Sequence, residues 1–134
     1  MTIAIDFDGT VVMHRYPAIG LDVPGAVRTL KKLVENGHKL ILYTMRHGKE
    51  LEEACQWFFD RGIPLYAVNE NPQQKSWTKS PKCYADLYID DAAFNCPLMY
   101  DTGVKNIKET RGYVDWKIVD DKLKKDGFYN KYIK

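Results

Sequence analysis

Apolar residues are arranged in two ways along the chain: in short runs, and at the spacing of a helix. Stretches of the two kinds alternate. Largely apolar runs, each short enough for a strand buried on both faces, cover residues 3–5, 39–43, 63–68 and 87–89. Between these runs, apolar residues recur at helical spacing over residues 24–36 and 49–60, and again over 114–123. Strand, helix and strand in this order predict parallel neighbours joined by right-handed crossovers.

Local signals place the ends of these elements. Pro24 suits the first turn of a helix, and Asn36-Gly37 and Arg61-Gly62 are typical helix stops. The inward faces of the first two helices are expected to use Val27, Leu30, Leu33, Val34, Leu51, Ala54, Cys55 and Phe58 or Phe59. Residues 11–23 predict a loop with one short hairpin, 94–99 one more short element, and Thr102-Gly103 a turn. Residues 69–81 predict a long polar loop that borders a site or is mobile.

The chain of 134 residues suits one domain, and 45% hydrophobic content argues against disorder. We therefore expect a single α/β domain over residues 1–134, with three Rossmann-like layers around a central, mainly parallel sheet. A net charge of +2, with aspartates between the C-terminal lysines, argues against nucleic acid as a partner. The sequence has no membrane-length apolar run and no N-terminal leader, so we expect a cytoplasmic protein. Three cysteines without a C-x-x-C spacing argue against a disulfide framework and a zinc site.

The first apolar run leads directly into Asp6-Phe7-Asp8, and Gly9 provides a sharp turn. These carboxylates are expected at the carboxyl edge of the sheet, where α/β proteins bind ligands. Two acids at this spacing repel each other unless a proton or a cation is present. A second pair, Asp90-Asp91, ends the strand at 87–89 and should reach the same edge. Magnesium accepts such carboxylates together with a substrate phosphate, so Asp6, Asp8, Asp90 and Asp91 are candidate metal ligands.

The second apolar run ends at Thr44, in the segment Thr44-Met45-Arg46-His47. Parallel geometry places this strand end beside the Asp6 turn, where a hydroxyl can donate to a phosphate oxygen. Taken alone, Thr44 is equally well explained as a residue that caps the following helix. His14 and His47 each follow one of these strand ends, and Arg15 and Arg46 accompany them. These four are candidate substrate contacts.

The pattern Asp-x-Asp-Gly-Thr after a buried strand resembles the first motif of the haloacid dehalogenase superfamily. Thr44 resembles the second motif, and Asp90-Asp91 matches the fourth. The third motif is a single lysine, for which Lys75, Lys79 and Lys82 compete. We choose Lys82, because Lys-x-Tyr-Ala-Asp-Leu-Tyr-Ile-Asp-Asp resembles small members of the superfamily without a cap domain. The resemblance covers about residues 1–95 and leaves the role of 96–134 open.

This resemblance implies a capless, magnesium-dependent phosphatase. Asp6 would attack phosphorus and form an aspartyl-phosphate, while Asp8 would protonate the leaving oxygen and then activate water. Magnesium would be bound by Asp6, the backbone carbonyl of Asp8, Asp90 and Asp91. Asp6, Phe7, Asp8, Thr44, Met45 and Lys82 would surround the phosphoryl group.

Two other functions remain open at this point. One is a phosphate-binding protein without turnover, and the other is a receiver-like domain phosphorylated by a partner kinase. Receivers carry their acceptor aspartate on a later strand, which argues against the second. The sequence identifies neither the substrate, whether a phosphorylated small molecule or an exposed phosphate on a larger one, nor the oligomeric state. A homo-oligomer is compatible with it.

Overall fold

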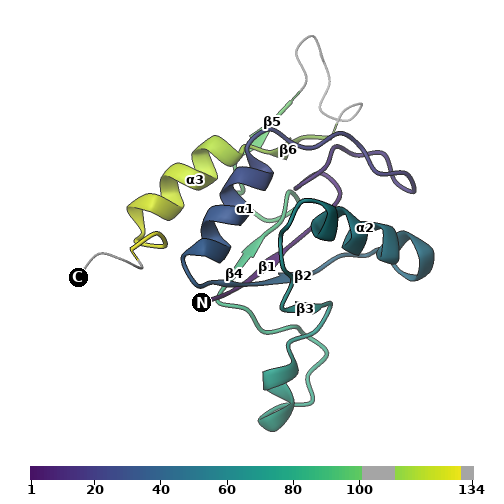
Figure 1. Cartoon of the computed structure of the whole chain (residues 1–134), viewed down its shortest axis with the longest axis vertical. Helices are drawn as coiled ribbons and strands as arrows, with labels where there is room; N and C mark the ends of the chain where they lie inside the picture. Colours follow the sequence, from purple (N-terminus) through teal and green to yellow (C-terminus); the bar gives the residue numbers. More distant parts are fainter. Residues whose placement is uncertain (101–110, 131–134) are drawn as a thin grey trace.

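A four-stranded parallel sheet forms the centre of the protein, seen here in a computed structural model that describes residues 1–100 and 111–130. Its strands, in chain order, are β1 (Thr2–Ile5), β2 (Lys39–Leu42), β3 (Ala67–Val68) and β4 (Leu87–Ile89). The other elements are helices α1 (Ala26–Glu35), α2 (Gly48–Asp60) and α3 (Trp116–Lys125), the 3-10 helix η1 (Pro72–Ser76) and the strand pair β5 (Leu98–Met99) and β6 (Tyr113–Val114). The predicted α/β class with a parallel sheet is confirmed (Figure 1).

The strand order is β3-β2-β1-β4, and every pair in it is parallel. Ile5 lies opposite Leu42 on one side and opposite Ile89 on the other. The ladder continues one step further, because the backbone N–H of Asp6 donates to the carbonyl of Ile89 over 3.0 Å. This register places the ends of β1 and β4 at the same height, so the residues that follow the two strands are neighbours.

One face of the sheet carries the main core. Ile3, Ile5, Leu40 and Leu42 are at most 1% exposed and form one cluster with side chains from all three α-helices. The helices contribute Leu30, Leu33, Ala54, Trp57, Phe58, Trp116 and Leu123. Figure 1 shows α1 and α3 next to each other, while η1 lies apart from the three α-helices. Burial of this apolar surface provides the main driving force for the fold.

The opposite face carries Ala4 and Ile41, both buried, and Tyr88. The hydroxyl of Tyr88 donates to the carbonyl of Cys83 and accepts from the N–H of Ala85, so the segment before β4 packs on this face. Residues 69–81 were predicted to be a loop without structure, and this was wrong because they contain η1. The sheet therefore has helices on one face and a largely irregular layer on the other.

Two buried amide side chains order this segment. Asn71 caps η1 by accepting from the N–H of Gln73 over 3.1 Å, and its Nδ2 donates to the carbonyl of Tyr84. Gln74 donates to the carbonyls of Ser80 and Lys82 and accepts from the N–H of Tyr84. These bonds close the segment on itself and against the start of β4.

Several predicted boundaries moved. The strand expected at 63–68 is only Ala67–Val68, because Pro64 has no N–H for a ladder and Ile63 closes α2 by donating to Phe58. Pro24 precedes α1 by two residues, and α3 begins after the cap residue Asp115, whose carboxylate accepts from Ile118.

Of the two alternatives predicted for the inward face of α2, Phe58 is the buried one, whereas Phe59 is 78% exposed. Trp57 is also buried on this helix and was not predicted.

Other predictions are confirmed. The loop at 11–23 has a hairpin-like core, in which Met13 donates to Leu21 and Val23 donates to Val11. The short element expected at 94–99 is β5, while the turn at Thr102-Gly103 lies outside the described residues. Among the described residues, none of the helices has the length and apolar character that a membrane span requires.

Candidate active site

Three carboxylates converge where β1 and β4 end. Asp6 follows β1 directly, and Asp90 and Asp91 follow β4. One oxygen from each of the three lies within 4.8 Å of the others. The sequence predicted this meeting from the parallel arrangement of the strands. The side chain of Asp8, the fourth predicted carboxylate, is not part of this group.

The convergence perturbs two of these acids. Burial, together with a hydrogen bond to Asp91 and the negative charge of Asp90, raises the pKa of Asp6 to about 8, although the hydroxyl of Thr10 opposes the rise. Burial also raises the pKa of Asp90, and the N–H of Ala92 opposes that rise. Proximity of like charges in a half-buried site favours the uptake of a positive charge, either a proton or a cation.

Thr10 joins two of the carboxylates and is fully buried. Its hydroxyl donates to Oδ2 of Asp6 over 2.8 Å and accepts from the N–H of Asp91 over 3.2 Å. Its carbonyl accepts from the indole N–H of Trp116 over 2.7 Å, which ties the site to α3. Sequence reasoning included Thr10 in the first motif but assigned it no role. Its position in Asp-Gly-Thr was the available signal.

Gly9 makes the turn that brings these groups together. Its φ is +80°, and a Cβ at this position would lie 2.1 Å from Nε2 of His14 and 2.6 Å from Oδ2 of Asp91. The same Nε2 of His14 is 3.2 Å from Oδ2 of Asp91 and 3.2 Å from the carbonyl of Gly112. His14 was a candidate substrate contact, but here it contacts a carboxylate of the site.

Asp8 points to Arg46 instead of the carboxylate cluster. Nε and Nη2 of Arg46 donate to the two oxygens of Asp8 over 2.8 and 2.7 Å, which is a bidentate pair. Nη1 and Nη2 also donate to the carbonyls of Pro17 and Ala18. Arg46 is only 2% exposed, and the bond to Asp8 raises its pKa. We predicted Arg46 as a substrate contact, but its donors are engaged within the protein.

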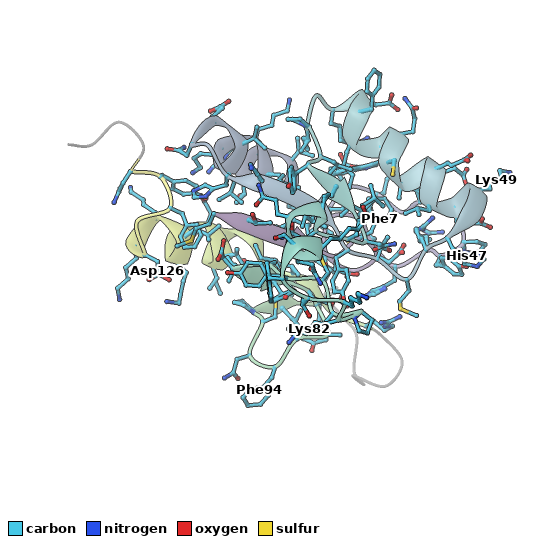
Figure 2. The ribbon with its side chains drawn as sticks, turned by 90° about the horizontal axis from the view of Figure 1, so that it is seen from below. Phe7, His47, Lys49, Lys82, Phe94 and Asp126 are labelled. Atoms are coloured by element: carbon cyan, nitrogen blue, oxygen red, sulfur yellow. The ribbon has the colours of Figure 1, made fainter. Side chains whose placement is uncertain are left out.

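The second strand end lies in the same cleft. The hydroxyl of Thr44 accepts from the N–H of Arg46 over 3.2 Å, and its own N–H donates to the side chain of Asn69. Met45 is 96% exposed. His47 is the exposed residue just before α2, and Figure 2 shows it at the periphery, with Phe7 inside the molecule. Because Phe7 is fully buried in the core, only its backbone can face a ligand.

A cleft of about 570 Å³ contains most of the predicted site. Its lining comprises Asp6, Asp8, His14, Tyr16, Thr44, Met45, Arg46, His47, Asp90, Asp91, Ala92 and Arg111. Arg111 was not predicted, and Tyr16 was predicted only as part of the stretch 13–16 that could set access to the site. Arg15, an exposed residue, and Lys82 are not among the lining residues.

None of the three lysine candidates, Lys75, Lys79 and Lys82, is among the lining residues of the cleft. The Nζ of Lys82 lies 5.9 Å from the ring centroid of Tyr88, which belongs to β4 and precedes Asp90 by two residues. Lys75 is 3.7 Å from Glu70 in an exposed ion pair, and Lys79 lines a separate cleft beside Asn71. The placement of Lys82 as the phosphate-binding lysine stays a prediction.

Comparisons with known proteins give one informative relationship. No protein-family model and no curated protein matches the chain. A solved structure of a conserved protein from Bacteroides thetaiotaomicron is 38% identical in sequence. The match covers 100% of this chain and 98% of that one, with a TM-score of 0.75. The two proteins therefore share a fold over their whole length.

Proposed function

We propose that the chain, which belongs to the same family as the conserved Bacteroides thetaiotaomicron protein, is a magnesium-dependent phosphomonoester hydrolase with Asp6 as its nucleophile. One observation carries the proposal: oxygens of Asp6, Asp90 and Asp91 lie within 4.8 Å of one another at the carboxyl edge of the sheet. The motif resemblance to the haloacid dehalogenase superfamily supplies the reaction type.

The donor set fits a hard divalent cation. It consists of carboxylate oxygens, which magnesium prefers, and it lies in a cleft where a substrate phosphate can complete the coordination. Burial is the main cause of the raised pKa values of Asp6 and Asp90, and the neighbouring carboxylates add to it, so the cluster favours a bound cation. Asp6, Asp90 and Asp91 would hold the ion, and the resemblance adds the backbone carbonyl of Asp8. When bound, magnesium would neutralise charge on these carboxylates and on the phosphoryl oxygens.

The motif resemblance implies two steps for these residues. A carboxylate oxygen of Asp6 attacks phosphorus, and the bond to the leaving oxygen breaks with its electron pair on that oxygen, which takes a proton from Asp8. Water then attacks the aspartyl-phosphate and gives its proton to Asp8, which returns Asp6 to a carboxylate and releases phosphate. Each oxygen of Asp8 has two acceptor positions, so the Arg46 pair leaves room for this proton.

Other groups in the cleft suit the binding of the phosphoryl group. Thr44 lines the same cleft as Asp6, and its hydroxyl can donate to a phosphoryl oxygen while it accepts from the backbone N–H of Arg46. Arg111 adds a cation to the lining. Cationic and hydrogen-bonding groups aimed at developing negative charge account for much of the acceleration in such reactions.

The test measures phosphate release from p-nitrophenyl phosphate with and without magnesium. Asp6→Asn should lower kcat by at least about a thousandfold, since the amide is a poor nucleophile of nearly the same shape. Asp60→Asn, on the exposed end of α2, is the matched control and should retain wild-type kcat. Acid quenching followed by mass spectrometry should find one phosphoryl group on the peptide that contains Asp6. Asp6→Asn with a tenth of wild-type activity would contradict the assignment, as would full activity in EDTA.

A further inference from the structure

We propose that Arg46 is a positioning residue for Asp8, and that it fixes the orientation of this carboxylate by tying it to the tip of the loop at residues 11–23. The inference rests on the proposed function. It adds a residue whose loss should slow the hydrolysis of the aspartyl-phosphate more than its formation. Nothing in the motif resemblance assigns Arg46 this part.

The geometry of the pair is restrictive. A guanidinium group is planar and rigid, so two parallel bonds to one carboxylate fix both the position and the plane of that carboxylate. Both bonds to Asp8 are short, at 2.8 and 2.7 Å. The side chain of Arg46 is 1% exposed and that of Asp8 is 20% exposed. Water therefore competes little for the arginine, while Asp8 keeps one side open to the cleft.

The arginine is itself held from two sides. Its Cζ lies 5.0 Å from the ring centroid of Phe7 and 5.2 Å from that of Tyr16. Phe7 packs edge to face against Trp57 in the core at 5.8 Å. The contact with Phe7 thus fixes the guanidinium group relative to the rigid core, and the bidentate pair in turn fixes the carboxylate of Asp8.

The remaining donors of Arg46 reach the loop tip. The last backbone pair of the loop is Met13 with Leu21, and residues 14–20 lie beyond it. In this tip, the carbonyl of Pro17 accepts from Nη1 over 3.1 Å and the carbonyl of Ala18 accepts from Nη2 over 2.7 Å. Since Tyr16 of the tip lines the cleft, the same side chain positions both Asp8 and one wall of the site.

The chemistry separates this role from a general structural one. Formation of the aspartyl-phosphate from p-nitrophenyl phosphate needs no proton, because p-nitrophenolate leaves as an anion. Hydrolysis does need Asp8: the water oxygen bonds to phosphorus, the water proton moves to Asp8, and the phosphorus–oxygen bond to Asp6 breaks with its electron pair on Asp6. A misplaced Asp8 should therefore let the first step proceed and delay the second.

The experiment is a rapid-quench measurement of p-nitrophenolate release with magnesium, in the wild type and in Arg46→Gln. The variant should show a burst of about one p-nitrophenolate per active site, followed by a steady rate about a hundredfold below wild type, the cost expected of a misplaced catalytic group. Asp8→Asn should give the same burst, and the double variant should be no slower than Asp8→Asn alone.

Arg61→Gln is the matched control. Arg61 also makes a bidentate pair with an aspartate, Asp22, and lies 4.2 Å from the ring centroid of Trp57, but it is not among the residues that line the cleft. Its loss should give no burst and should leave the steady rate per active site at the wild-type level. Arg46→Ala should regain steady rate on addition of guanidinium ion and not on addition of sodium at equal ionic strength.

The outcomes separate the inference from the function on which it rests. A wild type that releases no phosphate, or an Asp6→Asn variant that remains active, overturns the proposed function. A wild type that is active, with a burst in Asp8→Asn but none in Arg46→Gln, overturns only the role of Arg46. If Arg46→Gln does not fold, the same burst of p-nitrophenolate is measured in Arg46→Lys. This variant keeps the positive charge but cannot make the bidentate pair. A reduced amount of active enzyme with unchanged steady rate per active site also counts against the inference.

Discussion

Without a divalent ion, the protein should lose stability as the pH rises from about 4 to about 8, and magnesium should restore part of it. The pKa of Asp6 is about 8 in the folded protein, against an ordinary value of 3.8. The folded state thus binds this proton more tightly than the unfolded state. The stabilising contribution is fully present below pH 3.8 and is lost as the pH rises through about 8. The raised pKa of Asp90 acts in the same direction.

The interval between 3.8 and about 8, at about 1.4 kcal/mol per pH unit, gives an upper limit of about 6 kcal/mol for Asp6. Because Asp6 is only partly buried and solvent screens part of its interactions, we expect about 2–3 kcal/mol to be measured. Asp6→Asn has no such proton to lose. It should therefore be more stable than the wild type at about pH 8 by a similar amount.

The assay is urea unfolding at several pH values between about 4 and about 9, with EDTA and with saturating magnesium. The difference between wild type and Asp6→Asn at each pH isolates this carboxylate from all other titrating groups. Magnesium should flatten the wild-type profile above about pH 6, since a cation replaces the proton as the compensating charge. Parallel profiles for the two proteins would refute the raised pKa. A wild-type profile that magnesium does not change would refute the metal site.

Three further predictions follow from the same geometry. Gly9→Ala should destabilise the protein by about 1–3 kcal/mol and abolish most activity, because the new methyl group meets His14 and Asp91 at a φ of +80°. Urea unfolding checks the loss of stability, and kcat checks the loss of activity. Gly37→Ala, where a Cβ meets no atom within 4 Å, is the control for backbone strain alone. Calcium should bind but not support turnover, because it takes carboxylates in bidentate fashion and would leave Asp6 no oxygen for attack. Initial rates in magnesium titrations at fixed calcium concentrations should show competition between the two ions. Turnover supported by calcium would contradict this prediction. Lys82→Met should lower kcat/KM for p-nitrophenyl phosphate by at least about tenfold, while Lys79→Met should not, and equal effects would leave Lys82 without its predicted role.

The meeting of the carboxylates could be predicted because it depends on backbone topology alone. Apolar runs without alternation indicate parallel strands buried on both faces, and parallel strands bring their carboxyl ends to one edge. Asp6 and Asp90 follow two such runs, and the structure places these runs side by side as β1 and β4. Thr44 reaches the same cleft for the same reason, because β2 is the other neighbour of β1.

Side-chain partners between loops could not be predicted in this way. Asp8 and Arg46 are separated by 38 positions, and their pairing depends on where each side chain points after its strand has ended. The sequence offered Arg46 only as a cation near a strand end, which suggested a substrate contact. In contrast, η1 had a readable signal that was not used, since Asn71 before Pro72 is a typical helix cap followed by proline at the first helical position.

The Arg46–Asp8 pair and the Arg61–Asp22 pair differ in what they cost to form, and the difference bears on their purpose. Arg61 and Asp22 are 30% and 41% exposed, and such a pair contributes little to stability and costs little to form. The side chain of Arg46 is 1% exposed, so its charge has left water almost completely, and an apolar pair of equal volume would commonly be at least as stable. Stability alone thus gives weak grounds for a buried arginine at this position. Its location beside the turn that carries Asp6, the proposed nucleophile, fits a charge retained to orient Asp8 for its proposed role.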